Sequence, residues 1–152
     1  MDPKSRLYVY DFDDTLVNTH DVLIENDWMD EAKAGALCFA DSDIGYKVAD
    51  LCKPYQKMWK QVAATSKMGD NMILSGRSAK QIAYWLAENK KGNLFDILVG
   101  LGTREDVPQK KLEVLQKCAS EEYDEIYFYD DKLENIKVAK TVSKVIATHV
   151  QH

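Results

Sequence analysis

Acidic and hydroxyl side chains in this sequence follow directly after short apolar runs. Asp11, Asp13 and Thr15 come after the run at 7–10, and the pair Asp130 and Asp131 comes after the run at 126–129. Carboxylates next to a buried strand are costly to place unless solvent or a cation meets them. Two acidic strand ends brought together would form an oxygen-rich site that suits Mg²⁺. The sequence therefore predicts a magnesium site assembled from the ends of two strands.

A second group of residues could hold an anion. Ser75 and Gly76 follow the apolar run at 72–74 and precede a helical pattern. A hydroxyl and free backbone N–H groups at such a junction can cradle a phosphate, although the same residues could simply cap the helix. Lys110 and Lys111 fall in the first turn of another predicted helix, where the helix dipole favours anions. A role as charge partner of a phosphate and the carboxylates would explain one lysine, and the sequence leaves open which.

The elements that must position these residues alternate along the chain. Apolar runs that read as buried strands occur at 7–10, 72–74, 97–99, 126–129 and 145–147, and helical patterns occur at 55–64, 78–89, 108–118 and 133–140. This order predicts an α/β fold with a doubly wound, mostly parallel five-stranded sheet and helices on both faces. In such sheets the chemistry lies at the carboxyl ends of the strands.

Residues 18–52 do not fit this alternation. They mix apolar residues such as Trp28 and Phe39 with many acidic ones. We interpret the segment as a small insertion after the first strand that folds over the active face and packs down through its apolar residues. The expectation is a single catalytic domain over 1–152 with 18–52 as its flap, and the sequence does not predict the flap's internal structure.

Composition narrows the class of protein. A chain of 152 residues with 45% hydrophobic and 30% charged residues is expected to form one globular domain. Its net charge of −5 argues against a uniformly basic nucleic-acid surface. No apolar run approaches the roughly 20 residues that span a bilayer, and the first residues lack the apolar stretch of a secretory signal, so we expect a cytoplasmic protein without a membrane partner. The three cysteines and three histidines are scattered, which argues against a zinc site.

These clusters, in this order, resemble the motifs of the haloacid dehalogenase-like (HAD) superfamily of phosphohydrolases. Residues 11–16 (Asp-Phe-Asp-Asp-Thr-Leu) match its first motif, and Ser75 matches the hydroxyl of its second. Lys110 or Lys111 looks like the lysine of the third motif. Asp130 and Asp131, followed by Asn135, are similar to the acidic fourth motif. The resemblance extends over nearly the whole chain, from residue 8 to about residue 140.

The resemblance implies a Rossmann-like core, a Mg²⁺ cofactor and an aspartyl-phosphate intermediate. It makes Asp11 the nucleophile and Asp13 the acid and base that protonates the leaving group and then activates water. The residues implied in metal binding are Asp11, Asp13 (through its backbone carbonyl), Asp130 and Asp131. Those implied in binding the substrate phosphate are Thr15, Ser75, Gly76, Arg77 and one of Lys110 and Lys111.

Physical chemistry supports the same division of roles. The negative oxygens of a phosphate monoester repel a nucleophile, and its uncatalysed hydrolysis is among the slowest reactions known. An anionic aspartate can attack only if cations screen both partners. Passing through an acyl phosphate then needs an acid for one half of the reaction and a base for the other, and one residue can serve as both. The resemblance also indicates a phosphatase, because the dehalogenating branch does not keep an aspartate at the position of Asp13.

The nature of the phosphorylated substrate is less defined. The insertion is short for a full cap domain, which predicts a capless or minimally capped enzyme whose open site admits large substrates. Lys53, Lys57 and Lys60 would share one helix face and could follow a phosphate backbone, so nucleic-acid ends are one candidate and nucleotides or other small molecules are the other. A non-catalytic binding module on the same fold is the alternative from a different class; it is disfavoured because every catalytic position is filled. The sequence does not predict the oligomeric state.

Overall fold

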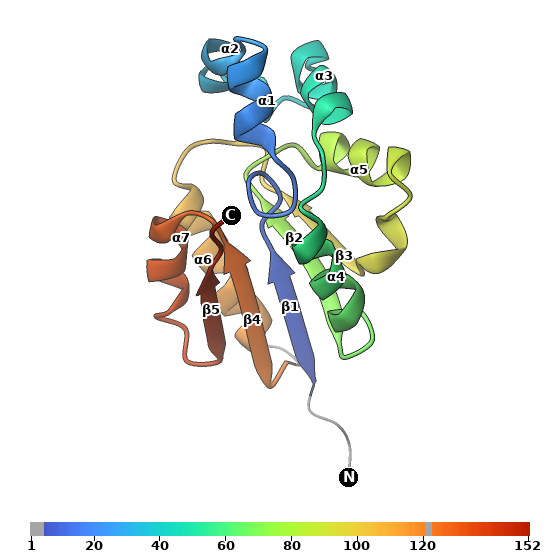
Figure 1. Ribbon diagram of the computed structural model, residues 1–152. Coiled ribbons are helices and arrows are strands. Elements are labelled where there is room, and N and C mark those ends of the chain that lie inside the picture. Colours follow the sequence, from blue (N-terminus) through green and yellow to red (C-terminus); the bar gives the residue numbers. More distant parts are fainter. Residues whose placement is uncertain (1–4, 121–122) are drawn as a thin grey trace.

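One five-stranded sheet forms the centre of the computed structural model, which describes residues 5–120 and 123–152. The strands are β1 (Arg6–Tyr10), β2 (Asp70–Ser75), β3 (Ile97–Gly100), β4 (Glu125–Asp130) and β5 (Val145–His149). They lie in the order β3-β2-β1-β4-β5, and every neighbouring pair is parallel (Figure 1). The predicted parallel sheet is therefore confirmed, and each predicted run lies within one of its strands.

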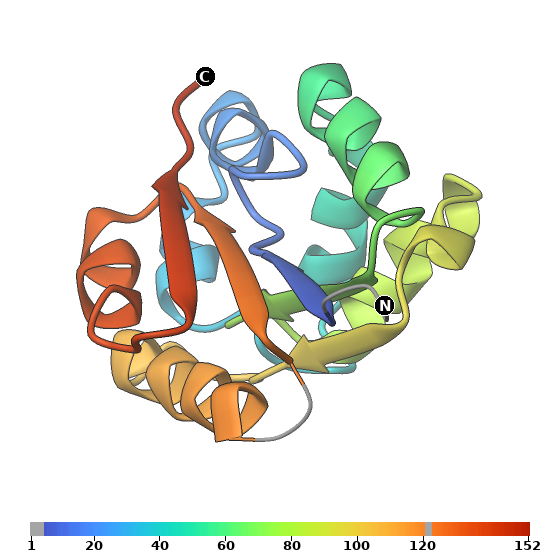
Figure 2. The ribbon, with the colours of Figure 1, turned by 90° about the horizontal axis from the view of Figure 1, so that it is seen from below.

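Helices cover both faces of the sheet (Figure 2). On one face lie α4 (Gln56–Thr65) and α5 (Ala79–Glu88), and on the other lie α6 (Val107–Ser120) and α7 (Leu133–Ala139); a short 3₁₀ helix, η1 (Gly92–Leu94), follows α5. Tyr10 and Ile73 pack with Trp59 and Trp85 on the first face, and Val9, Leu74, Leu115 and Ile136 pack together on the second. The doubly wound α/β class is confirmed. None of the helices in the described ranges has the length and apolar character needed to cross a membrane.

The strand order fixes where the two acidic ends meet. The chain moves outward from β1 to β2 and β3, then returns to the other side of β1 as β4, so the winding reverses between β1 and β4. Tyr10 pairs with Tyr129, and the backbone N–H of Asp11 donates to the carbonyl of Tyr129 at 2.9 Å. Asp11 and Asp130 therefore stand at adjacent strand ends at the switch point of the sheet.

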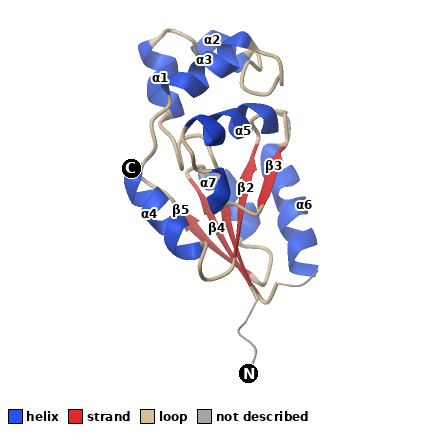
Figure 3. Ribbon diagram, turned by 90° about the vertical axis from the view of Figure 1, so that its right-hand side faces the viewer, coloured by secondary structure: helices blue, strands red, loops and turns tan. Residues whose placement is uncertain are grey.

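The segment after β1 contributes three short helices beyond the carboxyl ends of the strands (Figure 3). These are α1 (Thr19–Glu25), α2 (Met29–Lys33) and α3 (Asp43–Leu51). Val22 and Leu23 of α1 and Val48 and Ala49 of α3 are buried in the same hydrophobic cluster as α4 and α5. The insertion thus shares its core with one face of the sheet. That residues 1–152 work as one catalytic domain with 18–52 as its flap stays a prediction.

The chain enters and leaves this insertion at adjacent points. Val17 forms an antiparallel bridge with Pro54, and the backbone N–H of Tyr55 donates to the carbonyl of Leu16 at 2.9 Å. We call these paired segments, residues 16–18 and 53–55, the neck of the insertion. The neck joins the three helices to the end of β1 through a short backbone ladder.

A second attachment fastens the insertion to α5. Gln81 of α5 donates from its Nε2 atom to the carbonyls of Ala36 at 3.0 Å and Phe39 at 2.7 Å. Gly45 of α3 packs so closely on Gln81 that a Cβ atom at position 45 would lie 2.2 Å from Gln81 Nε2. The absence of a side chain at Gly45 therefore permits α3 to dock on α5.

Candidate active site

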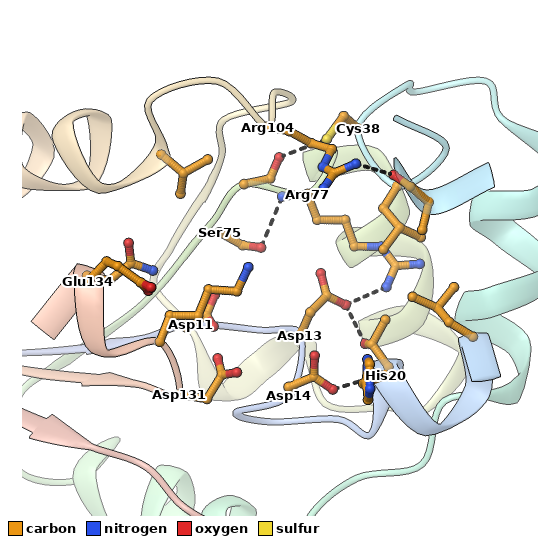
Figure 4. Close-up of a pocket in the computed structure, with 18 of the residues that line it drawn as sticks. Asp11, Asp13, Asp14, His20, Cys38, Ser75, Arg77, Arg104, Asp131 and Glu134 are labelled. Atoms are coloured by element: carbon orange, nitrogen blue, oxygen red, sulfur yellow. Dashed lines mark hydrogen bonds and ion pairs between the residues drawn. The ribbon is translucent and has the colours of Figure 1, made fainter. Parts of the chain in front are cut away.

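A cleft of about 850 Å³ opens between the carboxyl ends of the strands and the insertion (Figure 4). The predicted site residues that line it are Asp11, Asp13, Ser75, Gly76, Arg77, Lys111 and Asp131. Thr15 and Asp130 are fully buried behind this lining, and both hydrogen-bond to residues within it. The structure therefore brings together residues from four separate segments of the chain, and of the predicted set it leaves out Lys110.

Three carboxylates converge on one side of the cleft. Asp11, Asp130 and Asp131 each offer one oxygen, and these oxygens all lie within 4.8 Å of one another. We call them the carboxylate triad. The Nζ atom of Lys111 lies 3.0 Å from Asp11 Oδ1 and 2.7 Å from Asp130 Oδ2. One ammonium cannot balance three carboxylates, and an oxygen-only donor set with excess negative charge fits a hard divalent cation such as Mg²⁺.

Hydrogen bonds hold the triad in place. Asp130 accepts from the side-chain Nδ2 of Asn135 and from the backbone N–H of Lys132, both at 2.9 Å. The hydroxyl oxygen of Thr15 lies 3.2 Å from both Asp11 Oδ2 and Asp131 Oδ1. Thr15 thus links the end of β1 to the end of β4, which orients the carboxylates before any ligand arrives.

The electrostatics of the triad follow from burial. Burial raises the pKa of Asp11 well above its ordinary value, Asp130 raises it further, and the lowering effect of Lys111 does not compensate. For Lys111 itself burial lowers the pKa, but Asp11 and Asp130 together outweigh burial and raise it, so the ammonium stays charged. A cation bound to the triad would favour the ionised form of Asp11.

The two candidate lysines diverge. Neighbouring side chains on a helix point about 100° apart, so only one of two adjacent lysines can face the sheet. Lys111 is 2% exposed and reaches the triad, whereas Lys110 points its Nζ atom to the backbone carbonyl of Glu105 at 3.0 Å. The structure places Lys111, and not Lys110, in the cleft.

Asp13 stands apart from the triad. Its Oδ1 atom accepts hydrogen bonds from the Thr19 hydroxyl at 2.5 Å and from Arg77 at 2.8 Å (Figure 4). The next residue, Asp14, has a left-handed backbone with φ 64°, which aspartate tolerates better than most residues and which turns the chain sharply after β1. The side chain of Asp13 is therefore not a fourth member of the triad, and only its backbone carbonyl could contribute to the predicted metal site.

Arg77 lines the cleft and forms hydrogen bonds within the protein, and its predicted role as a phosphate ligand stays a prediction. The side chain is fully buried, and its guanidinium donates to Asp13, to Gln81 Oε1 at 3.0 Å and to the carbonyl of Gly45 at 2.8 Å. These bonds engage the guanidinium within the protein, where it orients Asp13. Ser75 remains suited to an anion, because its oxygen accepts from the N–H of Arg77 at 3.1 Å and leaves its own proton to donate.

Two residues that shape the site were not predicted from the sequence. Gln81 gave no clear signal, because Arg77 lies before the first residue of α5 and the two side chains meet only through the turn that precedes the helix. Thr19 gave no signal, because it reaches Asp13 only through the fold of the insertion. Thr19 shows that the insertion contributes directly to the surroundings of Asp13, and Gln81 of α5 holds the Arg77 side chain that also bonds to Asp13.

Comparisons with known proteins place the fold. No model of a known protein family matches the chain, and no curated protein sequence matches it. Among solved structures, a putative phosphatase from Clostridium difficile is similar with a TM-score of 0.67 at 16% identity, over 96% of this chain and 85% of that one. An L-2-haloacid dehalogenase from Xanthobacter autotrophicus is similar with a TM-score of 0.68 at 12% identity, over 96% of this chain and 77% of that one.

A third similar structure contains ligands. It is a HAD family enzyme from Bacteroides thetaiotaomicron in complex with magnesium and inorganic phosphate, with a TM-score of 0.65 at 10% identity, over 97% of this chain and 94% of that one. At such identities the similarity concerns the fold, and it agrees with the resemblance seen in the motifs. The chain has the fold of the HAD hydrolases.

Proposed function

Starting from the HAD fold of this chain, we propose that it is a magnesium-dependent phosphatase that hydrolyses phosphate monoesters through an aspartyl-phosphate intermediate. The observation that supports this most directly is the division of the acids. Asp11, Asp130 and Asp131 converge on one point, whereas Asp13 is held separately by hydrogen bonds of its own. The first group suits a metal ion and a nucleophile, and the second suits proton transfer.

In the proposed reaction, a carboxylate oxygen of Asp11 attacks phosphorus and the bond from phosphorus to the leaving oxygen breaks. Asp13 donates a proton to that oxygen as it departs. In the second half a water molecule attacks the phosphorus of the aspartyl phosphate, Asp13 takes the proton from the water, and the Asp11 carboxylate is released together with inorganic phosphate. Lys111 offsets negative charge beside Asp11 throughout.

The metal has a defined place in this proposal. The triad and the backbone carbonyl of Asp13 would hold Mg²⁺, and the ion would screen the negative charges of the phosphate and of Asp11 from each other. The Ser75 hydroxyl and the backbone at Gly76 would hold phosphate oxygens beside it, at the junction of β2 and α5. Thr15 would act by orienting Asp11 and Asp131.

The candidate substrates differ in size. For nucleic-acid ends the argument is the face of α4, where Lys57 and Lys60 are exposed while Met58 and Trp59 are buried. The insertion forms one wall of the cleft, which suits smaller phosphorylated molecules. The nucleic-acid partner and the cytoplasmic location stay predictions.

Hydrolysis of an aryl phosphate is expected to require Mg²⁺ and to stop when EDTA removes it. The physical reason is the excess negative charge of the triad, which repels a phosphate until a cation is bound. Initial rates with and without EDTA, followed by addition of excess Mg²⁺, measure this. Undiminished activity in excess EDTA would remove the metal from the mechanism, and no activity under any metal condition would favour a binding module.

Replacing Asp13 by asparagine is expected to lower kcat by roughly 10²–10⁴-fold, because an amide can neither donate the proton nor accept it. The loss should be smaller for leaving groups of low pKa in the first step, since they depart without protonation. Rates for a series of substituted phenyl phosphates measure this dependence.

Asp14→Asn is the matched control for this variant. It makes the same chemical change one residue later, and asparagine tolerates the left-handed backbone at position 14. We expect its activity to stay close to that of the unmodified protein. Equal losses of kcat in the two variants would contradict the acid role of Asp13. A loss of kcat in Asp13→Asn that does not depend on the pKa of the leaving group would contradict it as well.

A further inference from the structure

Two cationic side chains lie at the end of the cleft that is remote from the triad. Arg104, in the loop after β3, and Lys33, the last residue of α2, both line the cleft. Both also line an adjoining cavity of about 460 Å³, to which the triad does not contribute. Cys38 and Thr103 are shared by the two cavities as well. The smaller cavity therefore continues the cleft away from the proposed metal site.

Arg104 is anchored without being neutralised. It donates one hydrogen bond to the backbone carbonyl of Ala32 at 3.1 Å, which leaves its other N–H groups available. Within residues 5–120 and 123–152, no carboxylate forms a salt bridge with Arg104 or Lys33. Glu105 is the acidic residue that lines the smaller cavity beside them. The whole chain carries a net charge of −5, so this positively charged end of the cleft stands in contrast to the rest of the protein.

The leaving group of a substrate would extend toward these cations. Asp13 protonates the leaving oxygen in the proposed reaction, so the leaving group must begin beside Asp13. Cys38 lines the cleft together with Asp13 and Arg104, and its thiol donates to the carbonyl of Gly76 at 3.6 Å. Cys38 also lines the smaller cavity with Arg104, and Figure 4 shows Cys38 and Arg104 at the same end of the cleft. A leaving group that extends from Asp13 past Cys38 would therefore reach Arg104.

We propose that Arg104 and Lys33 bind a second anionic group, a carboxylate or a phosphate, that the substrate carries on its leaving group. The proposal rests on the proposed function and names the substrate class: small phosphate monoesters with a distal negative charge. The planar guanidinium of Arg104 is suited to bidentate contact with either anion, and Lys33 adds a point charge from the insertion. The loop after β3 would thus contribute one cation, Arg104, and the insertion would contribute the other, Lys33, to the selection of the substrate.

The test compares substrates that differ only at the far end. Alkyl phosphates of increasing chain length are prepared with a terminal carboxylate, a terminal phosphate or a terminal methyl group. The leaving oxygen has nearly the same pKa in the longer members, so differences in kcat/KM report contacts at the tail. We expect at least one length at which an anionic tail raises kcat/KM by about tenfold, the contribution of a charge-assisted hydrogen bond at a partly hydrated site.

Three variants complete the test. Arg104→Gln and Lys33→Gln are expected to reduce or erase the advantage of the anionic tail while leaving the methyl-tailed substrate unchanged. Lys137→Gln makes the same charge change on the exposed side of α7, away from both cavities, and is expected to keep the advantage. An advantage absent at every chain length, or one that survives in the double variant Arg104→Gln and Lys33→Gln, would overturn the proposal.

Failure of the proposed function can be told apart from failure of this inference. Phosphonate analogues, in which a methylene replaces the bridging oxygen, cannot be hydrolysed, and calorimetric titration in Mg²⁺ measures their binding. Tighter binding of the anionic-tailed phosphonate, reduced by Arg104→Gln, would support the subsite even if no phosphate ester were hydrolysed. Equal binding of anionic-tailed and methyl-tailed phosphonates would reject the subsite even if the protein proved an active phosphatase.

Discussion

Replacing Asp11 by asparagine is expected to abolish turnover and to leave the fold intact. An amide cannot form the acyl phosphate, so we expect the rate of hydrolysis of an aryl phosphate to fall by at least about 10³-fold. The fold should persist because Lys111 keeps its ion pair with Asp130 at 2.7 Å. Activity above a few per cent of that of the unmodified protein would place the nucleophile elsewhere.

The direction in which this variant changes the free energy of unfolding can be predicted. In the metal-free protein, the pKa of Asp11 is higher in the folded state than its ordinary value, because of burial and then of Asp130. The folded state therefore binds the proton more tightly than the unfolded state, so this residue lowers stability as the pH rises above the ordinary carboxyl pKa of about 3.9. The amide does not titrate. Urea unfolding in EDTA at neutral pH should show the asparagine variant to be at least as stable as the unmodified protein.

Replacing Lys111 by methionine is expected to cause the largest loss of stability among the variants considered. The substitution leaves Asp11 and Asp130 buried at the centre of the fold without their ammonium partner. Breaking a buried ion pair by removing one partner costs about 3–5 kcal/mol. Urea unfolding, followed by the fluorescence of the buried Trp59 and Trp85, measures this loss, with EDTA present so that a metal ion cannot replace the ammonium.

Lys110→Met is the matched control, because it makes the same chemical change one residue earlier on the same helix. Its Nζ atom bonds to the carbonyl of Glu105 at the surface, so its free energy of unfolding should change by no more than about 0.5 kcal/mol. The two variants should also differ in activity, with Lys111→Met inactive and Lys110→Met close to normal. Similar effects at the two positions would mean that neither ammonium supports the triad.

Much of the fold could be predicted because each strand contains a short apolar run, and the runs of the central strands β1 and β2 are almost wholly buried. Such runs, as at 7–10 and 126–129, are typical of parallel sheets covered by helices, and their alternation with helical patterns favoured this topology. The polar residues that follow them pointed to the cleft for the same reason. Asp11 and Asp130 are adjacent because parallel strands place their carboxyl ends along one edge.

The insertion could not be predicted in the same way. Its helices have 7, 5 and 9 residues, too short for a periodic pattern to emerge, and they depend on packing against α5 and the core. For that reason the hydrogen bond from Thr19 to Asp13 could not be predicted from the residues alone. The choice between Lys110 and Lys111 was open because it depends on the rotation of α6 about its axis, which a shift of one residue at the helix start would change.

The neck of the insertion has a consequence for how this protein could be redesigned. Because residues 16–18 and 53–55 are paired, the segment between them begins and ends at one point, and the entropy of closing it depends only weakly on its length. A transplanted segment of another size could therefore start and finish at the same two anchor points without altering the register of β1 and β2. Such a graft would still have to cover the indole of Trp85, which donates to the carbonyl of Cys52 at the edge of the neck. The neck thus provides two adjacent anchor points for a replacement segment, and that segment would also have to accept the hydrogen bonds that Gln81 of α5 donates to the present insertion.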